Sequence, residues 1–186
     1  MKMRRLTAQQ AVKLLGEFYD TCPDQMEAGF GWEHAPDQIG RNETIFEFRD
    51  KAAVPDPAHP AVPDVEKEVV VGFGILEMNL RDAADTEAFL SAGVFPPYRR
   101  RGYWHKIMDM MIDKAKALGA DFAARVVMKE NEEHYRRSMR EAHSEGSGWI
   151  YAGDHWHPAP GYGYFIFPFD EKERAEGKAA GKEHTE

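Results

Sequence analysis

Apolar residues recur along the chain with two different periods, and each period predicts a type of secondary structure. Alternation in segments rich in Val, Ile and Phe predicts strands, whereas apolar residues three and four positions apart predict a helix with one buried face. The predicted strands are residues 3–6, 44–48, 68–79, 87–95, 123–128, 149–156 and 161–169. The predicted helices are residues 7–19, 103–118 and 131–142, and residues 29–40 form a loop or a broken helix. This order predicts an α/β (α+β) domain with a mixed central sheet of about six to seven strands flanked by about four helices.

The two clearest helices carry recognisable signals at their ends. Thr7 is predicted to be the N-cap of the first helix, and Gly119 is suited to end the helix of residues 103–118 in a left-handed conformation. The buried face of the first helix is predicted to be Ala11, Leu14, Leu15 and Phe18. The buried face of the second is predicted to be Trp104, Ile107, Met108, Met111, Ala115 and Leu118. Each helix is therefore expected to pack one face on the rest of the domain.

The chain length of 186 residues suits one compact domain, which we place at residues 1–169. A hydrophobic fraction of 42% is enough for a core, and 12% aromatic residues argue against a disordered chain. Residues 170–186 are highly charged, so we predict a flexible tail there. The only cysteine is Cys22, which excludes a disulfide within the chain and favours a reducing cytoplasm. The charged first residues precede no apolar run, so we expect no signal peptide and no membrane partner.

The formal net charge is -8, from 32 acidic and 24 basic residues. Proteins that bind nucleic acid have the opposite excess, so this balance disfavours that class of partner. The negative charge favours a cationic partner such as an amine, and it equally serves the solubility of a cytosolic protein.

Residues 94–104 join a predicted strand to the strongest predicted helix. Pro96 and Pro97 cannot donate hydrogen bonds to a sheet, so the strand is expected to end there. The first amides of a helix have no partner within it, and the positive end of the helix dipole lies behind them. Gly102 lets an anion approach the backbone, and residues 99–101 are three consecutive arginines. The junction therefore predicts a pyrophosphate site, and the alternative is a solvated arginine-rich loop.

This junction resembles motif A of the GNAT superfamily of N-acetyltransferases. The motif is a strand ending in Val-x-Pro-x-x, followed by Arg/Gln-x-x-Gly-x-Gly/Ala at the start of a helix. Val94, Pro96, Arg99 and Gly102 match it in order and spacing, and Trp104 stands where the family has Gly or Ala. The order of elements over residues 3–169 is also similar to the GNAT fold. The resemblance implies an acyl-CoA-dependent N-acyltransferase, with acetyl-CoA (coenzyme A) as the cofactor.

The resemblance also implies which residues hold the cofactor. The backbone of Gly93, Val94 and Phe95 would pair with the pantetheine arm, as an additional strand would. Asn131 would contact the pantetheine or cap its own helix. The strands of residues 87–95 and 123–128 would splay apart to admit the thioester. The pyrophosphate would be held at Arg99, Arg100, Arg101, Gly102, Tyr103, Trp104 and His105.

Acetylation of an amine needs a group that removes the ammonium proton, because only the neutral amine has a lone pair. Family members often place a glutamate on the strand before motif A, which here implies Glu87, with Glu77 as a second candidate. An exposed glutamate at a strand end is the structural alternative for Glu87. Tyr135 is implied as the proton donor to the leaving thiolate, although Ser138 occupies the family's tyrosine position; a tyrosine packed on the sheet is the alternative. Cys22 lies far from the motif in sequence, which suits direct transfer without a covalent intermediate.

Two further segments suggest the surroundings of the acceptor. His155 and His157 share one face of a predicted strand, but a metal site usually needs three or four ligands, so we expect no metal. We interpret residues 149–156 as an aromatic strand near the acceptor cleft. Trp32, Glu33 and His34 are expected to line the same cleft, because this region often covers the acceptor in GNAT folds.

Two classes of function remain open from the sequence. The first is an enzyme that transfers acetyl from acetyl-CoA directly to an amine, either on a small molecule or on a protein lysine or N-terminus. The second is a GNAT-like module that binds coenzyme A, or serves an assembly, without catalysis. The sequence leaves the oligomeric state open, with a homodimer among the options.

Overall fold

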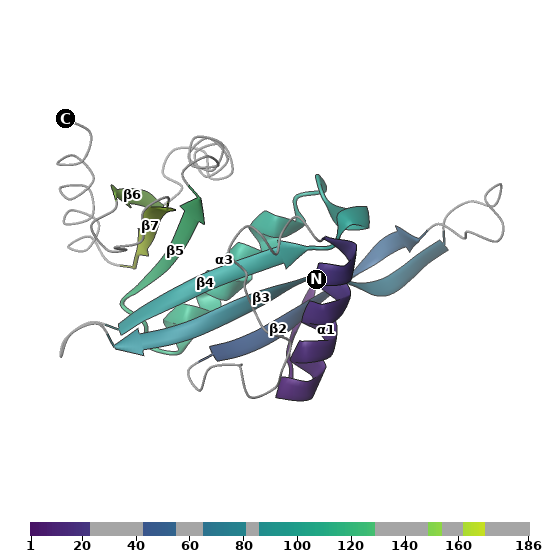
Figure 1. Ribbon diagram of the computed structural model, residues 1–186, viewed down its shortest axis with the longest axis horizontal. Helices are drawn as coiled ribbons and strands as arrows, with labels where there is room; N and C mark the ends of the chain where they lie inside the picture. The colour runs from purple at the N-terminus through teal and green to yellow at the C-terminus, as the bar shows by residue number, and fades with distance from the viewer. Residues whose placement is uncertain (23–42, 55–64, 81–85, 129–148, 154–161, 170–186) are drawn as a thin grey trace. The chain divides into compact units, whose positions relative to one another are not determined.

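The computed structural model describes residues 1–22, 43–54, 65–80, 86–128, 149–153 and 162–169 (Figure 1). Its strands are β1 (Lys2–Arg5), β2 (Glu43–Val54), β3 (Val65–Leu80), β4 (Thr86–Val94), β5 (Phe122–Met128), β6 (Ile150–Gly153) and β7 (Tyr162–Pro168). Its helices are α1 (Ala8–Thr21), the short 3₁₀ helix η1 (Pro96–Tyr98) and α3 (Tyr103–Ala117). The strands form a 7-stranded sheet in the order β1-β2-β3-β4-β5-β7-β6. The pairing of β4 with β5 is parallel and that of β1 with β2 antiparallel, which confirms the predicted mixed sheet.

Several predicted segments lie outside the described residues. They are the loop or broken helix of residues 29–40, the helix of residues 131–142 and the tail of residues 170–186. The described chain groups into two compact units. The first comprises Met1–Ile75 and Ala92–Met110, and the second comprises Leu76–Ser91 and Met111–Glu186. The strands β3 and β4 and the helix α3 contribute residues to both units.

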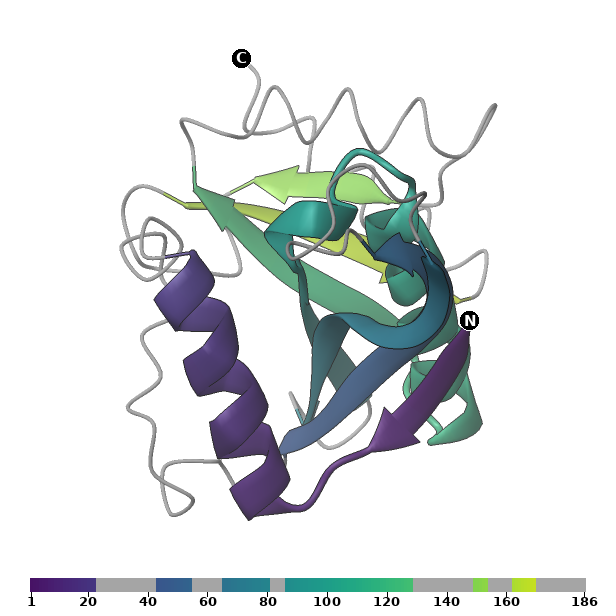
Figure 2. The ribbon, with the colours of Figure 1, turned by 90° about the vertical axis from the view of Figure 1, so that its right-hand side faces the viewer.

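In the first unit, β1 runs antiparallel to β2 before the chain turns into α1 (Figure 2). The turn ends at Thr7, whose side-chain oxygen accepts a hydrogen bond from the backbone N–H of Gln10 at 3.3 Å. The Gln10 side chain accepts one from the backbone N–H of Thr7 at 3.0 Å. This capping box satisfies two amides at the start of the helix and confirms Thr7 as the predicted N-cap.

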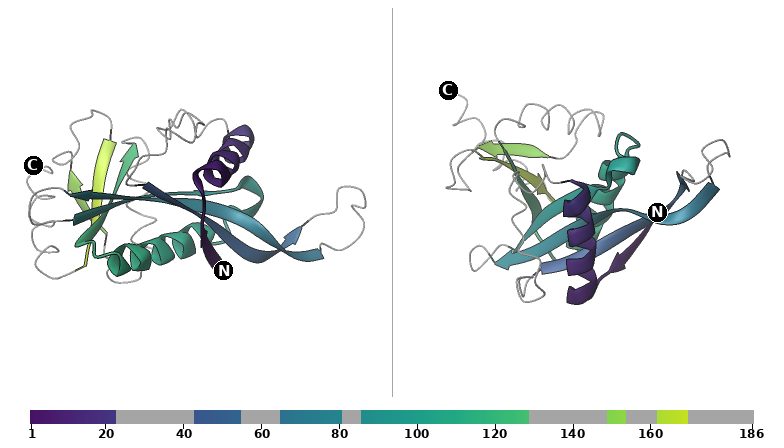
Figure 3. Two further views of the ribbon diagram at one scale, coloured as in Figure 1. Left: turned by 90° about the horizontal axis from the view of Figure 1, so that it is seen from below. Right: turned by 45° about the vertical axis from the view of Figure 1, so that its right-hand side comes forward.

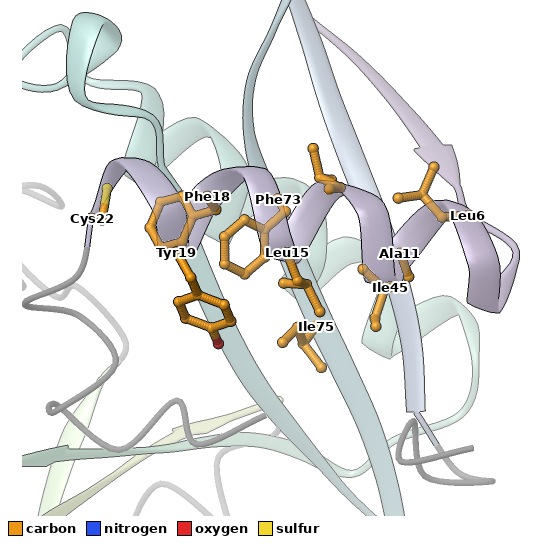
Figure 4. Close-up of a cluster of buried hydrophobic side chains, with 10 residues drawn as sticks. Leu6, Ala11, Leu15, Phe18, Tyr19, Cys22, Ile45, Phe73 and Ile75 are labelled. Carbon is orange, nitrogen blue, oxygen red and sulfur yellow. The ribbon is translucent and has the colours of Figure 1, made fainter. Parts of the chain in front are cut away.

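The apolar face of α1 packs on β2 and β3 in one hydrophobic cluster (Figure 4). Phe18 lies at its centre, with its ring edge-on to Phe73 at 4.8 Å and to Phe95 at 5.5 Å between centroids. The predicted buried face is confirmed, and the same cluster includes Tyr19 and Cys22. Its members are Leu6, Ala11, Leu14, Leu15, Phe18, Tyr19, Cys22, Ile45, Phe73 and Ile75.

The two helices cover opposite faces of the sheet in this unit (Figure 3). A Cβ added to Gly93 on β4 would lie 2.9 Å from Phe18 of α1. A Cβ added to Gly72 on β3 would instead lie 2.8 Å from Ile107 in the first half of α3. The sheet is therefore packed on both faces near the end of β4, before the chain enters η1.

The second unit is built on β5. This strand pairs antiparallel with β7 from Phe122↔Pro168 to Met128↔Tyr162. It pairs in parallel with β4 at Glu87↔Phe122, Ala88↔Ala123 and Phe89↔Ala124. Among the described residues the ladder of β4 and β5 consists of these three pairs. Asp121 fixes the start of the ladder, because its N–H donates to the Thr86 carbonyl and its carboxylate accepts from the Thr86 N–H.

Two predicted boundaries differ from the structure. The second long helix ends at Ala117, so Leu118 lies in the following turn and is 47% exposed; its assignment to the buried face was wrong. Gly119 has a φ of 83°, which confirms the predicted left-handed helix end. The strand β2 extends beyond residue 48 through Arg49, Asp50 and Lys51, because backbone pairing such as Lys2↔Arg49 does not require apolar side chains.

Candidate functional site

The strand β4 ends where two prolines begin the 3₁₀ helix η1. The Phe95 N–H donates to the Val71 carbonyl of β3 at 3.0 Å, which is the last sheet contact before the prolines. The chain then forms η1, in which the Tyr98 N–H donates to the Phe95 carbonyl and the Arg99 N–H donates to the Pro96 carbonyl. Proline has no N–H to continue a ladder, so β4 ends for the reason predicted from the sequence.

Residues 99–105, where the sequence predicts a pyrophosphate and which we therefore call the phosphate turn, have an unusual backbone. Arg100 has a φ of 60° and Gly102 a φ of 75°, whereas Arg101 between them is outside the positive region. Alternation of this kind turns successive N–H groups toward one side and forms a concavity that binds anions. A non-glycine residue with positive φ is uncommon, and such strain clusters at binding sites. The backbone of residues 99–105 therefore has the φ pattern of an anion-binding concavity.

Gly102 also begins α3. Its carbonyl accepts the first helical hydrogen bond, from the Lys106 N–H at 3.3 Å. The first turn of the helix contains no acidic side chain, whereas the last turn contains Lys114 and Lys116. The lysines complement the negative end of the dipole, and the positive end faces the phosphate turn. The electrostatics of the turn therefore favour a bound anion.

All three arginines of the turn are exposed. Arg99 nevertheless contacts the rest of the protein: its Nε donates to the Val94 carbonyl at 3.1 Å, and its Nη2 lies 2.9 Å from the sulfur of Cys22. The structure thus brings Cys22 to the motif across 77 positions of sequence. Sequence spacing contained no signal for this contact, and it was missed.

The aromatic residues at the start of α3 occupy different environments. Tyr103 is buried and lies edge-on to Tyr98, with 6.4 Å between ring centroids. Burial, reinforced by the nearby carboxylate of Asp50, raises the pKa of Tyr103. Trp104 is only half-buried and lies edge-on to the imidazole of His105 at 5.1 Å between ring centroids. The fully buried positions of this helix are further along, beginning with Ile107.

The last residues of β4 are tightly packed. A Cβ added to Gly93 would lie 2.5 Å from the Phe73 ring, so only glycine fits beneath the aromatic cluster. A Cβ added to Gly72 would lie 2.3 Å from the Gly93 carbonyl oxygen, so the two strands also need glycine where they pass each other. Val94 is buried and Phe95 half-buried. The predicted pantetheine segment is therefore closely packed on the face that lies against Phe73 and Phe18.

Glu87 lies at the start of β4 and is 8% exposed. It is in register with Phe122, and the next residue but one, Phe89, packs against Phe122 and Ala124. The structural alternative of an exposed strand-end glutamate is therefore wrong. Glu77 on β3 is half-buried. The other predicted chemical groups, Asn131 and Tyr135, lie outside the described residues.

The described parts of the chain contain no group of three or more His, Cys, Asp or Glu side chains placed to hold a metal ion. Two parts of the chain are expected near the acceptor, residues 32–34 and the aromatic strand of residues 149–156. Residues 32–34 and 154–156 lie outside the described residues, whereas residues 150–153 form β6. Within the described ranges, no helix has the combined length and apolar character that crossing a membrane requires.

The chain is similar to known proteins in sequence and in fold. Residues 17–136 match the model of the Acetyltransferase (GNAT) family. No curated protein sequence matches the chain. Similar solved structures include a spermidine N-acetyltransferase from Vibrio cholerae in complex with CoA and spermine, with 13% identity, a TM-score of 0.58, and coverage of 90% of this chain and 94% of that chain.

Two further structures are similar over comparable lengths. The ribosomal-protein-S18-alanine N-acetyltransferase from Escherichia coli has 16% identity, a TM-score of 0.57, and coverage of 91% of this chain and 94% of that chain. NAA60 from Arabidopsis thaliana, in complex with acetyl-CoA, has 12% identity, a TM-score of 0.53, and coverage of 92% and 98%. At these identities the similarity concerns the fold, and it confirms the fold predicted from the sequence.

Proposed function

The chain belongs to the GNAT family of acetyltransferases, and from this premise we propose that it transfers the acetyl group of acetyl-CoA directly to an amine. The observation that carries the proposal is the phosphate turn. It combines φ signs that alternate over residues 100–102, a helix N-terminus without acidic side chains, and three exposed arginines in a protein of net charge -8. Such a site suits a multiply charged anion such as a pyrophosphate.

The cofactor assignment extends from this turn along β4. In the proposal, the pyrophosphate binds the backbone of residues 100–105, and the pantetheine arm pairs with the backbone of residues 93–95. Two of the similar structures contain CoA or acetyl-CoA, which supports the same cofactor here. The tight packing of Gly93 supports a fixed backbone edge for the arm.

The chemistry needs a proton acceptor for the amine and a proton donor for the thiolate. We assign the first role to Glu87, which takes the amine proton directly or through a water molecule, and the second to Tyr135. The nitrogen–carbon bond then forms as the carbon–sulfur bond breaks, and no covalent enzyme intermediate is needed. The burial of Glu87 supports its role, since a base shielded from bulk water is held in one position.

The acceptor is an amine of a small molecule or of a protein. The similar structures include an enzyme named for spermidine and one named for a ribosomal-protein alanine, so this fold serves both kinds of acceptor. The net charge of -8 favours a cationic acceptor but does not separate the two.

A second candidate function is a module that binds coenzyme A without catalysis. The specific observation in its favour is Trp104, a large half-buried side chain at the position where the family motif has Gly or Ala. Isothermal titration with acetyl-CoA, followed by a thiol-release assay over a panel of amines, separates the candidates. Binding with turnover supports the enzyme, and binding without turnover supports the module. No binding at high micromolar acetyl-CoA would refute both.

Glu87→Gln tests the assigned base. The amide keeps the shape of the side chain but cannot take a proton, so we expect kcat to fall most near neutral pH while the affinity for acetyl-CoA stays unchanged. Glu66→Gln, at an exposed position on β3, is the matched control and should retain full turnover. Normal kcat in Glu87→Gln would remove Glu87 from this role.

A further inference from the structure

Arg99 does not extend from the phosphate turn toward an incoming anion. Its guanidinium makes two contacts with the protein, one with the Val94 carbonyl at 3.1 Å and one with the Cys22 sulfur at 2.9 Å. Arginine has five N–H donors in a rigid fork, which suits it to bridge two acceptors that are separate in sequence. Arg99 is exposed, as are Arg100 and Arg101 of the same turn, so these two contacts rather than burial distinguish it.

The first contact holds the end of β4. The Phe95 N–H is directed to β3, where it donates to the Val71 carbonyl. Val94 C=O and Phe95 N–H belong to one trans peptide group and point in opposite directions, so the carbonyl of Val94 faces the other edge. A backbone carbonyl at such a position needs a partner, and the Arg99 Nε supplies it. The last peptide group of β4 is thereby fixed.

The second contact holds the end of α1. Cys22 is the C-cap of this helix, and its N–H donates to the Tyr19 carbonyl at 3.2 Å. The last turn of α1 contains no basic residue, so the guanidinium is a positive charge placed at the negative end of the helix. Cys22 is 5% exposed and lies beyond Tyr19 in the cluster centred on Phe18 (Figure 4).

We propose that Arg99 is a positioning residue: it links the last carbonyl of β4 to the end of α1 and so holds the phosphate turn and the adjoining backbone in their binding shape. The ligand part of this inference rests on the proposed function, whereas the link itself does not. The competing role, implied by the family motif, is direct contact between the Arg99 guanidinium and the pyrophosphate.

The link is tested without any cofactor. Arg99→Met keeps much of the side-chain length but removes both donors, so the end of α1 should open more often. Cys22 is the only cysteine, so a thiol-reactive disulfide reagent labels this residue alone. At saturating reagent, where opening limits the reaction, the labelling rate reports this opening and not the reactivity of the thiol. We expect the rate to rise by about tenfold or more, the effect of losing a charged hydrogen bond. Arg5→Met, at an exposed arginine of β1, is the control and should leave the rate unchanged. An unchanged rate in Arg99→Met would overturn the link.

The positioning role is tested with two ligands, CoA and pantetheine, which lacks the pyrophosphate. A disturbed β4 backbone weakens both, so Arg99→Met should raise the dissociation constants of CoA and pantetheine by similar factors. Arg101→Met should weaken CoA alone. Loss of CoA affinity with normal pantetheine affinity in Arg99→Met would show direct phosphate contact and overturn the proposal. If the wild-type protein binds neither ligand, the proposed function fails, and the thiol result still decides the link.

Arg99→Lys covers the case in which Arg99→Met does not fold. Lysine keeps the positive charge but cannot span both acceptors with a fork. Positioning therefore predicts faster thiol reaction and weaker binding of both ligands in Arg99→Lys. Direct phosphate contact predicts that lysine largely preserves CoA affinity, which would count against our proposal.

Discussion

Replacing Gly102 with alanine isolates the backbone requirement of the phosphate turn. Gly102 has a φ of 75°, and a Cβ added to it meets nothing within 4 Å. The cost of alanine is therefore conformational rather than steric. A left-handed conformation costs an L-residue about 1–2 kcal/mol. For a chain of this size, we expect Gly102→Ala to lower the melting temperature by about 2–8 °C.

Gly16→Ala is the matched control, because a Cβ added to Gly16 also meets nothing within 4 Å. Gly16 lies inside α1 and does not have a positive φ. Alanine there should stabilise the protein by about 0.5–1 kcal/mol, since glycine is unfavourable within a helix. The two substitutions are the same chemically and should change the melting temperature, measured by circular dichroism, in opposite directions. If Gly102→Ala leaves the melting temperature unchanged or raises it, the positive φ is not the reason for glycine at this position.

Gly102→Glu adds bulk and negative charge at the proposed pyrophosphate site. Because the position is exposed and open, the loss of stability should resemble that of Gly102→Ala, and the protein should stay folded. Titration calorimetry should detect no CoA binding by this variant, whereas Gly102→Ala should retain part of the affinity. Wild-type affinity in Gly102→Glu would show that the pyrophosphate binds elsewhere.

Two further substitutions test the packing and the charges of the first unit. Gly93→Ala places a Cβ 2.5 Å from Phe73, so urea unfolding should show a loss of about 1–3 kcal/mol; a neutral result would contradict the close packing. Burial opposes ionisation of Glu47, but hydrogen bonds from Arg4 and Arg49, each 2.7 Å long, outweigh it and lower its pKa below 4.5. Its ion pairs therefore stabilise the fold above pH 4.5 and are lost as the pH falls through the lowered pKa. Glu47→Gln should lower the free energy of unfolding by about 1–2 kcal/mol at pH 7, a modest loss because both arginines are partly exposed. The variant should also lose less stability than the wild type as the pH falls. Equal losses in the two proteins would contradict this assignment.

Features that depend on neighbours in sequence could be predicted well. The helix start at Thr7 follows from a hydroxyl and the residue three positions later, Gln10. The end of β4 follows from two prolines that have no N–H. The helix end was predicted less well at Leu118, because periodicity cannot show whether the last apolar residue falls inside the final turn or just beyond it.

Features that depend on contacts across the sheet could not be predicted. Glu47 alternates with apolar residues in β2, and nothing in that segment shows that Arg4 of another strand lies in register with it. The contact of Arg99 with Cys22 joins a turn and a helix end that the sequence separates by 77 positions. Such contacts arise when strand order and helix packing are combined, and local propensity contains no information about either.

The two glycines of the junction show how the structure refines the site. From the sequence, both Gly93 and Gly102 were expected beside the cofactor. Gly93 has aromatic rings within 3 Å of the space a Cβ would occupy, so no ligand atom can lie over that face of β4. Gly102 has open space where a Cβ would lie and a positive φ. The proposed cofactor can therefore approach this end of β4 only along the edge of the strand, through backbone hydrogen bonds, whereas it can approach Gly102 directly. Because Arg99 occupies the Val94 carbonyl at that edge, the N–H of Val94 is the group we expect the pantetheine arm to use.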